Sequence, residues 1–256
     1  MITTVSGFVT RVKQTHNTWG EPTYVWFRGE PKSSLPLLPK LYRAKPGGDR
    51  HEENKLLQMF RMRAQSYSQN PVPIRENIDQ WLFLAQHVGL PTRLLDWTEN
   101  SLLALHFSLK CDEPIVWMID PIKLNSLSAE RTKDRRLAKM DEFPLTWYRP
   151  KGGVINIGHE NIRAAWERDR RGVDLPVAVH PTYLHPRMSA QRSVFSVHGR
   201  LKLPIPDLIP KHFLVSLEIS PSHKRGLERE LRTLGVQEAS AFPDLDGLAR
   251  ELASLY

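Results

Sequence analysis

The spacing of apolar positions predicts helices in the first half of the chain. Apolar residues that recur every three or four positions indicate one helix over about 51–67 and a second over about 78–88. Gly89 is the expected end of the second helix, because glycine readily takes the left-handed conformation that follows helix C-termini. Thr98 is expected to be the N-cap of a third helix, whose apolar stripe is Leu102, Leu105 and Leu109.

Apolar runs predict the strands. Residues 25–27 indicate a short strand that stops at Gly29, and residues 115–119 form a continuous run typical of a buried strand. Later in the chain we expect three strands, at 177–180, 194–198 and 213–219, and two closing amphipathic helices, around 227–235 and 248–252.

The order of these elements indicates the fold class. Helices cluster early, most strands come late, and strand and helix do not alternate regularly, which favours α+β over a doubly wound sheet. Over about 124–171 the pattern weakens and charge rises, so exposed helices and loops are expected there. At 256 residues and 40% hydrophobic composition, one domain over 1–256 is the simplest prediction.

Composition narrows the possible chemistry. Cys111 is the sole cysteine, which excludes an internal disulfide and a cysteine-based zinc site. His180, His185 and His198 lie close in sequence but at spacings that match no zinc motif, so no metal site is predicted. With no signal-peptide pattern and no apolar run of about 18 residues, we expect a cytoplasmic protein that does not enter a membrane.

The charge suggests an anionic partner. The formal net charge is +8 and the pI about 9.7, a bias that concentrates phosphates, nucleotides or nucleic acid near the surface. The charge is spread along the chain without a basic tail, so a well-solvated basic surface that has no polyanionic partner is an alternative.

Polar residues interrupt apolar runs in three segments. Arg28 follows a predicted strand, where its planar fork suits phosphate or carboxylate, although a structural pair with a neighbouring glutamate explains it equally well. The segment 86–98 places polar and aromatic side chains between two helices and can line a cleft, or can be a buried loop held by an Arg93–Asp96 pair. The segment 187–197 is a polar approach to an alternating strand.

Together these segments resemble the FRG domain family. The resemblance rests on Phe27-Arg28-Gly29, on residues 86–98 with Ala104 and Phe107 behind them, on Arg187 with Gln191 and Phe195, and on the closing residues 242–248. It runs from about residue 24 to residue 256. The resemblance implies a prokaryotic protein, with stress or phage defence as its expected setting.

A more distant resemblance is to the arginine class of ADP-ribosyltransferases, whose motif has three parts in order along the chain. Arg28-Gly29 is similar to the first part of the motif, and Thr98 with Ala104 and Phe107 is similar to the second. The segment from Gln191 to Phe195 lies where the third part is expected. This resemblance implies split antiparallel sheets with helices around them and a central cleft. It also implies NAD as a substrate, Arg28, Thr98 and Gln191 as catalytic residues, and binding by Arg28, Gly29, His87, Thr92, Arg93, Asp96, Trp97 and Phe195.

The third part of the motif in this chain differs from that of the active enzymes. Gln191 offers a neutral amide where the active enzymes carry a glutamate, and losing one preorganised electrostatic contact typically costs about a hundred- to thousandfold in rate. Another acid then has to supply the charge, with Glu30, Asp96 and Glu160 as candidates, or the chemistry is different, or the cleft only binds. The sequence therefore predicts a nucleotide-binding cleft with or without ADP-ribosyl chemistry. The alternative is a non-catalytic module that binds nucleic acid or a protein through its basic surface.

Overall fold

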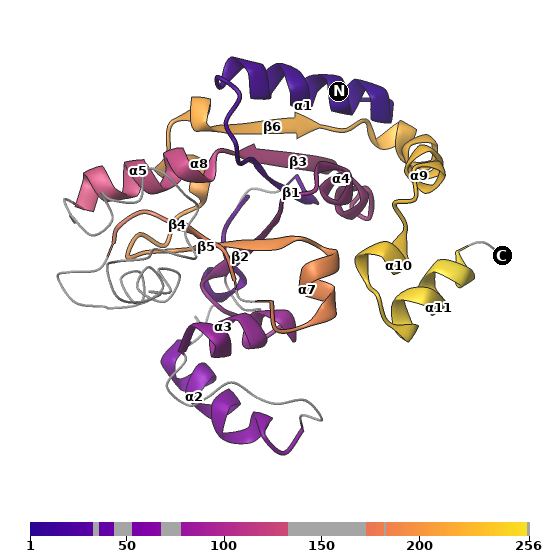
Figure 1. Cartoon of the computed structure of the whole chain (residues 1–256). Helices are drawn as coiled ribbons and strands as arrows, with labels where there is room; N and C mark the ends of the chain where they lie inside the picture. The colour runs from indigo at the N-terminus through magenta and orange to yellow at the C-terminus, as the bar shows by residue number, and fades with distance from the viewer. Residues whose placement is uncertain (33–35, 44–52, 68–77, 133–172, 182, 255–256) are drawn as a thin grey trace, which may run out of the picture.

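The computed structural model describes the chain except for residues 33–35, 44–52, 68–77, 133–172, 182 and 255–256. Its centre is a six-stranded antiparallel sheet in the order β4-β5-β2-β1-β3-β6 (Figure 1). The strands are β1 Trp26–Pro31, β2 Leu94–Thr98, β3 Pro114–Ile119, β4 Val177–Val179, β5 Ser193–Val197 and β6 Leu214–Glu218.

The sheet divides into two halves of three strands. Within the halves the ladders are continuous: β1 pairs with β3 at six positions and β2 pairs with β5 at five. Between the halves, the register of β1 and β2 among the described residues consists of Phe27 opposite Thr98 alone. The β4-β5-β2 half and the β1-β3-β6 half therefore separate on leaving this pair, which opens space between them.

Helices cover the faces and ends of the sheet. Helices α1 and α9 lie beside β6, whereas α2 and α3 lie at the opposite end of the molecule, and α10 and α11 form a separate lobe beside α7 (Figure 1). The helices are α1 Val5–Thr18, α2 Glu53–Ala64, α3 Ile78–His87, α4 Ser101–Leu109, α5 Pro121–Thr132, α7 Pro186–Ala190, α8 Ile205–Leu208, α9 Lys224–Thr233, α10 Glu238–Ala241 and α11 Leu245–Ala253. Three short 3₁₀ turns lie at Lys40–Tyr42, Lys211–Phe213 and Pro221–His223.

The buried apolar side chains form three clusters. One packs α2 and α3 against β2, β4 and β5, with Trp81, Phe83 and Phe195 among its members. A second packs α5 and α8 against the sheet around Trp26 and Trp97. The third joins α1, α4 and α9 to β1, β3 and β6. The first cluster therefore belongs to the β4-β5-β2 half and the third to the β1-β3-β6 half, whereas the second spans both halves.

The fold class is confirmed as α+β with an antiparallel sheet. The helix at 78–88, its end at Gly89, the later strands and the two C-terminal helices lie where they were predicted. The strand predicted at 115–119 is β3, which is buried along most of its length. Among the described residues of 124–171, α5 reaches Thr132, and the rest of that prediction falls outside the described part.

Three local predictions are wrong. The first strand does not stop at Gly29 but continues to Pro31, paired with β3 along its whole length. Residues 94–98 are the strand β2 and not a loop. Thr98 is not an N-cap, because Asn100 caps α4 by accepting hydrogen bonds from the backbone N–H groups of Leu102 and Leu103.

The N-terminal helix α1 and the short helix α10 were not predicted. Phe8 of α1 is fully buried in the third cluster and Val5 is buried beside it, whereas Val9 and Val12 are only partly buried. Among the described residues, none of the helices has the length and apolar character needed to cross a bilayer.

Gly29 allows α4 to pack directly on β1. A Cβ atom at this position would lie 2.0 Å from the carbonyl oxygen of Ala104 and 2.6 Å from the backbone nitrogen of Ser108. Both are backbone atoms of α4, so neither can rotate away. Because α4 also contacts β2 and β3, this close approach helps to fix the position of Arg28 relative to β2.

We expect Gly29→Ala to destabilise the fold by roughly 3 kcal/mol, because the added methyl group must push α4 away from β1. Gly226→Ala is the matched control: Gly226 lies within α9, and a Cβ there meets nothing within 4 Å. It should stabilise α9 by roughly 0.5–1 kcal/mol. Urea unfolding measures both, and a Gly29→Ala protein as stable as wild type would contradict the packing argument.

Candidate functional site

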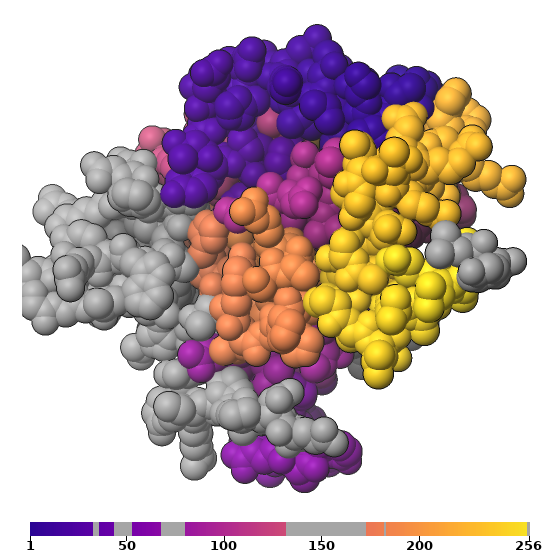
Figure 2. Space-filling model, turned by 45° about the vertical axis from the view of Figure 1, so that its right-hand side comes forward, coloured from indigo at the N-terminus to yellow at the C-terminus, as the bar shows by residue number. Residues whose placement is uncertain are grey.

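A cavity of about 700 Å³ opens where the two halves of the sheet separate. Its wall comes from β1, β2 and β5 and from α3, α4 and α7. Phe242 adds a contribution from residues 238–253, which contain α10 and α11 and are called the C-terminal segment below. Figure 2 shows the region around β5 and α7 (orange) in contact with that segment (yellow). The lining residues are Phe27, Arg28, Gly29, Gln86, His87, Val88, Gly89, Asp96, Trp97, Thr98, Phe107, Arg187, Met188, Gln191, Ser193, Phe195 and Phe242.

Arg28 is held in the cavity wall by its neighbours. Its Nε donates to Glu30 Oε2 at 3.0 Å, and its Nη1 donates to the backbone oxygen of Asp96 at 2.8 Å. Its Nη2 donates to no described residue, so the guanidinium keeps donors for a ligand. Arg28 therefore forms the structural pair with a glutamate and also lines the cavity.

Glu30 does not belong to the cavity. It is 6% exposed, and in addition to the Arg28 hydrogen bond it accepts one from the backbone N–H of Leu37 at 2.9 Å. Both carboxylate oxygens are thus engaged in holding β1 and the following segment. Glu30 positions Arg28 and is not available as the missing acid.

Asp96 is the one carboxylate among the described residues that line the cavity. Its side chain is 53% exposed, and Oδ2 lies 3.8 Å from Arg28 Nη1. Gln86 Nε2 donates to the same oxygen at 2.7 Å, and Thr92 donates its hydroxyl to Gln86 Oε1 at 2.6 Å. A chain of hydrogen bonds from Thr92 through Gln86 therefore orients the Asp96 carboxylate.

Thr92 and Arg93 do not reach the cavity, contrary to their predicted binding role. Thr92 is 2% exposed and its hydroxyl also accepts from the backbone N–H of Leu94. Arg93 pairs with Glu53 of α2 and not with Asp96: Nε donates to Oε1 at 2.8 Å, and Nη2 donates to Oε2. Successive side chains of a strand point to opposite faces, so Arg93 and Asp96 diverge.

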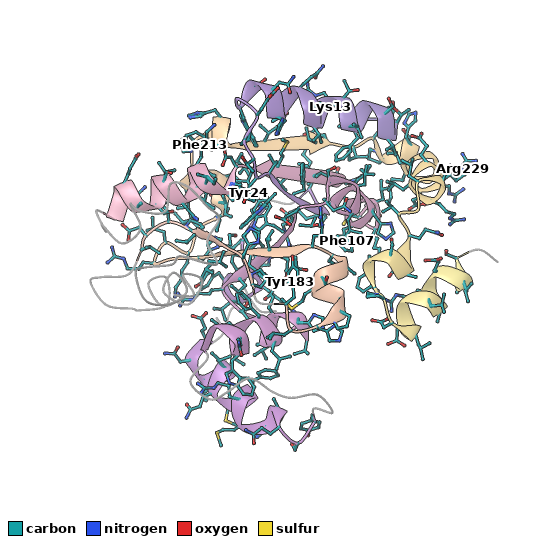
Figure 3. The ribbon with its side chains drawn as sticks, in the orientation of Figure 1. Lys13, Tyr24, Phe107, Tyr183, Phe213 and Arg229 are labelled. Carbon is teal, nitrogen blue, oxygen red and sulfur yellow. The ribbon has the colours of Figure 1, made fainter. Side chains whose placement is uncertain are left out.

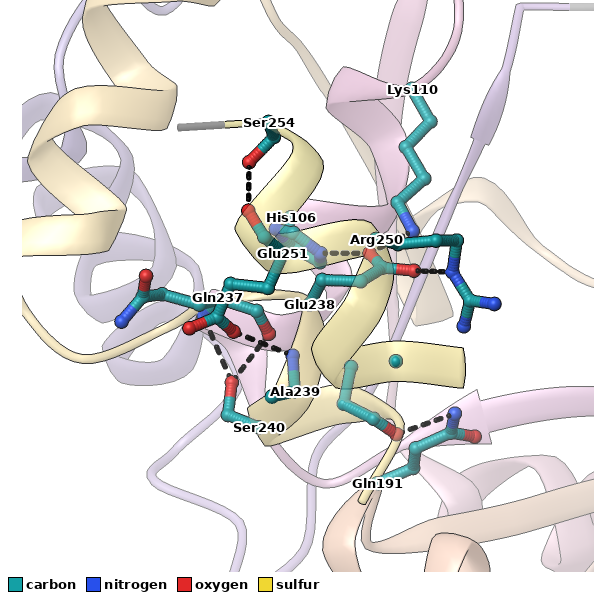
Figure 4. A network of polar contacts seen from close by, with 12 residues as sticks. His106, Lys110, Gln191, Gln237, Glu238, Ala239, Ser240, Arg250, Glu251 and Ser254 are labelled. Atoms are coloured by element: carbon teal, nitrogen blue, oxygen red, sulfur yellow. Dashed lines mark hydrogen bonds and ion pairs between the residues drawn. The ribbon is translucent and has the colours of Figure 1, made fainter. Parts of the chain in front are cut away.

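Thr98 and Gln191 meet at the edge of the cavity. The hydroxyl of Thr98 donates to the backbone oxygen of Gln191 at 2.7 Å and accepts from the backbone N–H of Asn100. The side-chain amide of Gln191 donates to the backbone oxygen of Ala241 at 3.0 Å, as Figure 4 shows. These hydrogen bonds join β2, α7 and the C-terminal segment, so both residues help to assemble the cavity as well as line it.

The predicted aromatic residues are in the wall, but their rings belong to the core. Trp97 is 3% exposed and its Nε1 donates to Ser196 Oγ at 3.0 Å. Phe195 is equally buried and stacks on Phe83 at 5.1 Å between ring centroids. Only a small part of each side chain is therefore open to the cavity.

A second aromatic pair was given no role by the sequence. Phe107 of α4 and Phe242 of the C-terminal segment meet edge to face, with ring centroids 6.0 Å apart, and both line the cavity. Figure 3 places Phe107 between α4 and α7. The signal was present in the motif at 104–107 and in the closing residues 242–248, but only the fold brings them together.

His87 is a neutral member of the wall. Its pKa is lowered to about 4, first by burial and then by the neighbouring His185 and Arg187. The rings of His87 and His185 lie 4.4 Å apart, and His185 Nδ1 accepts from the backbone N–H of Arg187 as the N-cap of α7. At neutral pH the cations of this wall are therefore arginines.

The other two histidines of the late region lie elsewhere. His198 is fully buried, its Nε2 contacts the backbone oxygen of Leu203, and burial lowers its pKa to about 3. His180 packs edge-on against Trp26 with ring centroids 5.4 Å apart. Within the described ranges, no three side chains of histidine, cysteine or acidic type gather as metal ligands do.

Fold and cavity together define an α+β protein with a basic, partly aromatic cleft between two halves of an antiparallel sheet. Residues 23–114 match the family model of the FRG domain, which is what this part of the chain resembles. No curated protein and no solved structure matched the chain. Among the cavity residues, the match covers Arg28 and Asp96 but not those that follow β3, and a single domain over 1–256 stays a prediction.

The Arg93–Glu53 pair supports the site from behind, because it ties α2 to β2. Each side chain is 7% exposed, so we expect Glu53→Gln to destabilise the fold by about 3–5 kcal/mol by leaving a buried guanidinium without its counter-charge. The exposed pair of Lys32 with Glu218 is the control, and Glu218→Gln should cost about 1 kcal/mol or less. Denaturant unfolding compares them, and equal effects would contradict a structural role for Glu53.

Proposed function

We propose that the cavity binds a nicotinamide dinucleotide and that the chain acts on its glycosidic bond, by transfer or release of ADP-ribose. The observation that carries the proposal is the Arg28 guanidinium, fixed by Glu30 on the wall of the cavity with Nη2 left for an anion. A volume of about 700 Å³ lies in the range of small-molecule sites.

The charges of the wall favour a phosphate-bearing ligand. Arg28 and Arg187 both line the cavity and carry guanidinium groups with several N–H donors. Guanidinium groups match phosphate geometry with two parallel hydrogen bonds. The net charge of +8 adds long-range attraction for the same kind of ligand.

The proposed reaction breaks the bond between ribose C1′ and the nicotinamide nitrogen. The bonding electron pair leaves with nicotinamide, and positive charge develops on the ribose. Water or an acceptor then attacks C1′ through a lone pair and loses a proton. A carboxylate near the ribose stabilises the developing charge. Asp96 is suited to this role, because it lines the cavity and both oxygens of Glu30 are engaged.

Gln191 offers an amide to a ribose hydroxyl and no charge, and Glu160 lies outside the described residues. Consumption of NAD is the type of activity that fits the phage-defence setting expected for the family.

Calorimetry with the oxidised dinucleotide tests the binding part of the proposal. Arg28→Lys keeps a positive charge beside Glu30 but lacks the planar fork, so we expect dinucleotide affinity to fall at least about tenfold. Arg200→Lys is the control, because Arg200 pairs with Asp174 at the surface and does not line the cavity. Its affinity should equal that of wild type.

The absence of binding to wild type would overturn the proposal. Tight binding of RNA or DNA that weakens steeply with salt and is unchanged in Arg28→Lys would favour the module that uses its basic surface.

Asp96→Asn tests the chemical part. Release of nicotinamide, followed by chromatography, should fall about a hundred- to thousandfold, because the amide has no charge to stabilise the cation. Dinucleotide affinity should not fall, since an aspartate repels the diphosphate. Asp174→Asn is the control, as this carboxylate pairs with Arg200 away from the cavity. A rate in Asp96→Asn equal to that of wild type would remove Asp96 from the reaction.

A further inference from the structure

Arg187 stands out among the cations of the cavity because of how it is held. It lies in the first turn of α7, directly after the N-cap His185 and Pro186. Its guanidinium carbon lies 4.1 Å from the ring centroid of Phe242, so the group rests on an aromatic face. It lines the cavity together with that ring.

The side chain of Arg187 makes no hydrogen bond and no ion pair with the described residues. Arg250 shows the contrast, because it packs on the same ring at 5.0 Å while its Nε donates to Glu238 Oε1 at 2.9 Å (Figure 4). Arg250 does not line the cavity. One arginine on this ring is therefore neutralised, and the other presents its donors beside an open space.

Partial burial adds to the demand for a counter-charge. Burial is the largest influence on the pKa of Arg187 and lowers it, against the raising effect of Asp244 and Asp96. Removing a cation from water is unfavourable unless an anion meets it. A phosphate group in the cavity satisfies this demand through the unused N–H donors.

Arg28, Asp96 and Arg187 line the same cavity. The carboxylate of Asp96 lies 3.8 Å from Arg28 Nη1, and its charge also raises the pKa of Arg187. One negative charge on the wall thus interacts with both guanidinium groups, although they come from β1 and α7. An anion that binds in the cavity therefore has guanidinium groups from both elements in the surrounding wall.

We propose that Arg187, held flat on Phe242, forms with Arg28 a two-arginine clamp for one diphosphate group. That this diphosphate belongs to a dinucleotide rests on the proposed function, whereas the clamp itself requires only the diphosphate. Stacking on the ring fixes the plane of the guanidinium, so its fork is oriented before the ligand arrives. The clamp makes Arg187 a binding residue and Phe242 a positioning residue.

The C-terminal segment takes part in this clamp because it supplies the ring. Phe242 follows α10 directly, and α10 is fixed by Glu238, which accepts from Lys110 of α4 and from Arg250 of α11 (Figure 4). Gln191 adds a further tie through its hydrogen bond to the oxygen of Ala241. The site is thus completed by residues more than 200 positions after Arg28.

Titration calorimetry with inorganic diphosphate and with ADP tests the clamp in a matched set of variants. Arg187→Gln should weaken both probes about ten- to hundredfold, because it removes a charged hydrogen-bond donor. Arg187→Lys should recover only part of this loss, since lysine has no fork. Arg200→Lys is the control, because Arg200 pairs with Asp174 at the surface and does not line the cavity, and it should bind as wild type. Phe242→Leu should weaken binding less than Arg187→Gln, because it frees the guanidinium without removing it.

The outcomes separate this proposal from the proposed function. Unchanged binding in Arg187→Gln, or an equal loss in Arg200→Lys, overturns the clamp. If the dinucleotide depends on Arg28 but not on Arg187, the clamp is wrong and the proposed function stands. If diphosphate depends on both arginines and the dinucleotide does not bind, the clamp stands and the proposed function is wrong. If wild type binds no probe, both are wrong.

Discussion

The structure depends on the narrow junction between the two halves of its sheet. Phe27 opposite Thr98 is the pair that joins them, and beyond it β1 follows β3 while β2 follows β5. Open sheets twist, so strands that are not held together by a ladder diverge. The cavity occupies this divergence, and Arg28, one residue after the junction, lies on its wall. The close approach of α4 at Gly29 keeps β1 in place, so the packing of this helix on the sheet helps to set the position of Arg28 in the cavity wall.

The charged groups around the cavity are divided between support and binding. Glu30 and Glu53 are buried acids that hold Arg28 and Arg93, and neither reaches the open space. Asp96 is exposed and oriented by an amide, which leaves it free for a ligand or for chemistry. The same residue types serve both purposes, and burial decides which one applies. A guanidinium whose partners are buried stays in place, and its remaining donors face the cavity.

Much of the fold was readable from local patterns. The helix at 78–88, its end at Gly89 and the late strands follow from apolar spacing, because such spacing reflects one buried face of a single element. The errors fall where local signals competed. Thr98 is a residue type that favours the N-cap position, but it pairs with β5 as the last residue of β2. Asn100 is the N-cap of α4 instead. α1 was missed because its burial depends on few residues, among them Phe8.

The sequence by itself determined the match of residues 23–114 to the FRG domain, the α+β class and most of the polar residues that converge on one cavity, since motif and periodicity are properties of neighbouring residues. The tertiary structure alone decided which side chains contact one another. Arg93 pairs with Glu53, forty positions away, and Arg187 rests on Phe242 from the far end of the chain. Such pairings depend on how elements pack against one another, and side-chain spacing within one element carries no record of that packing.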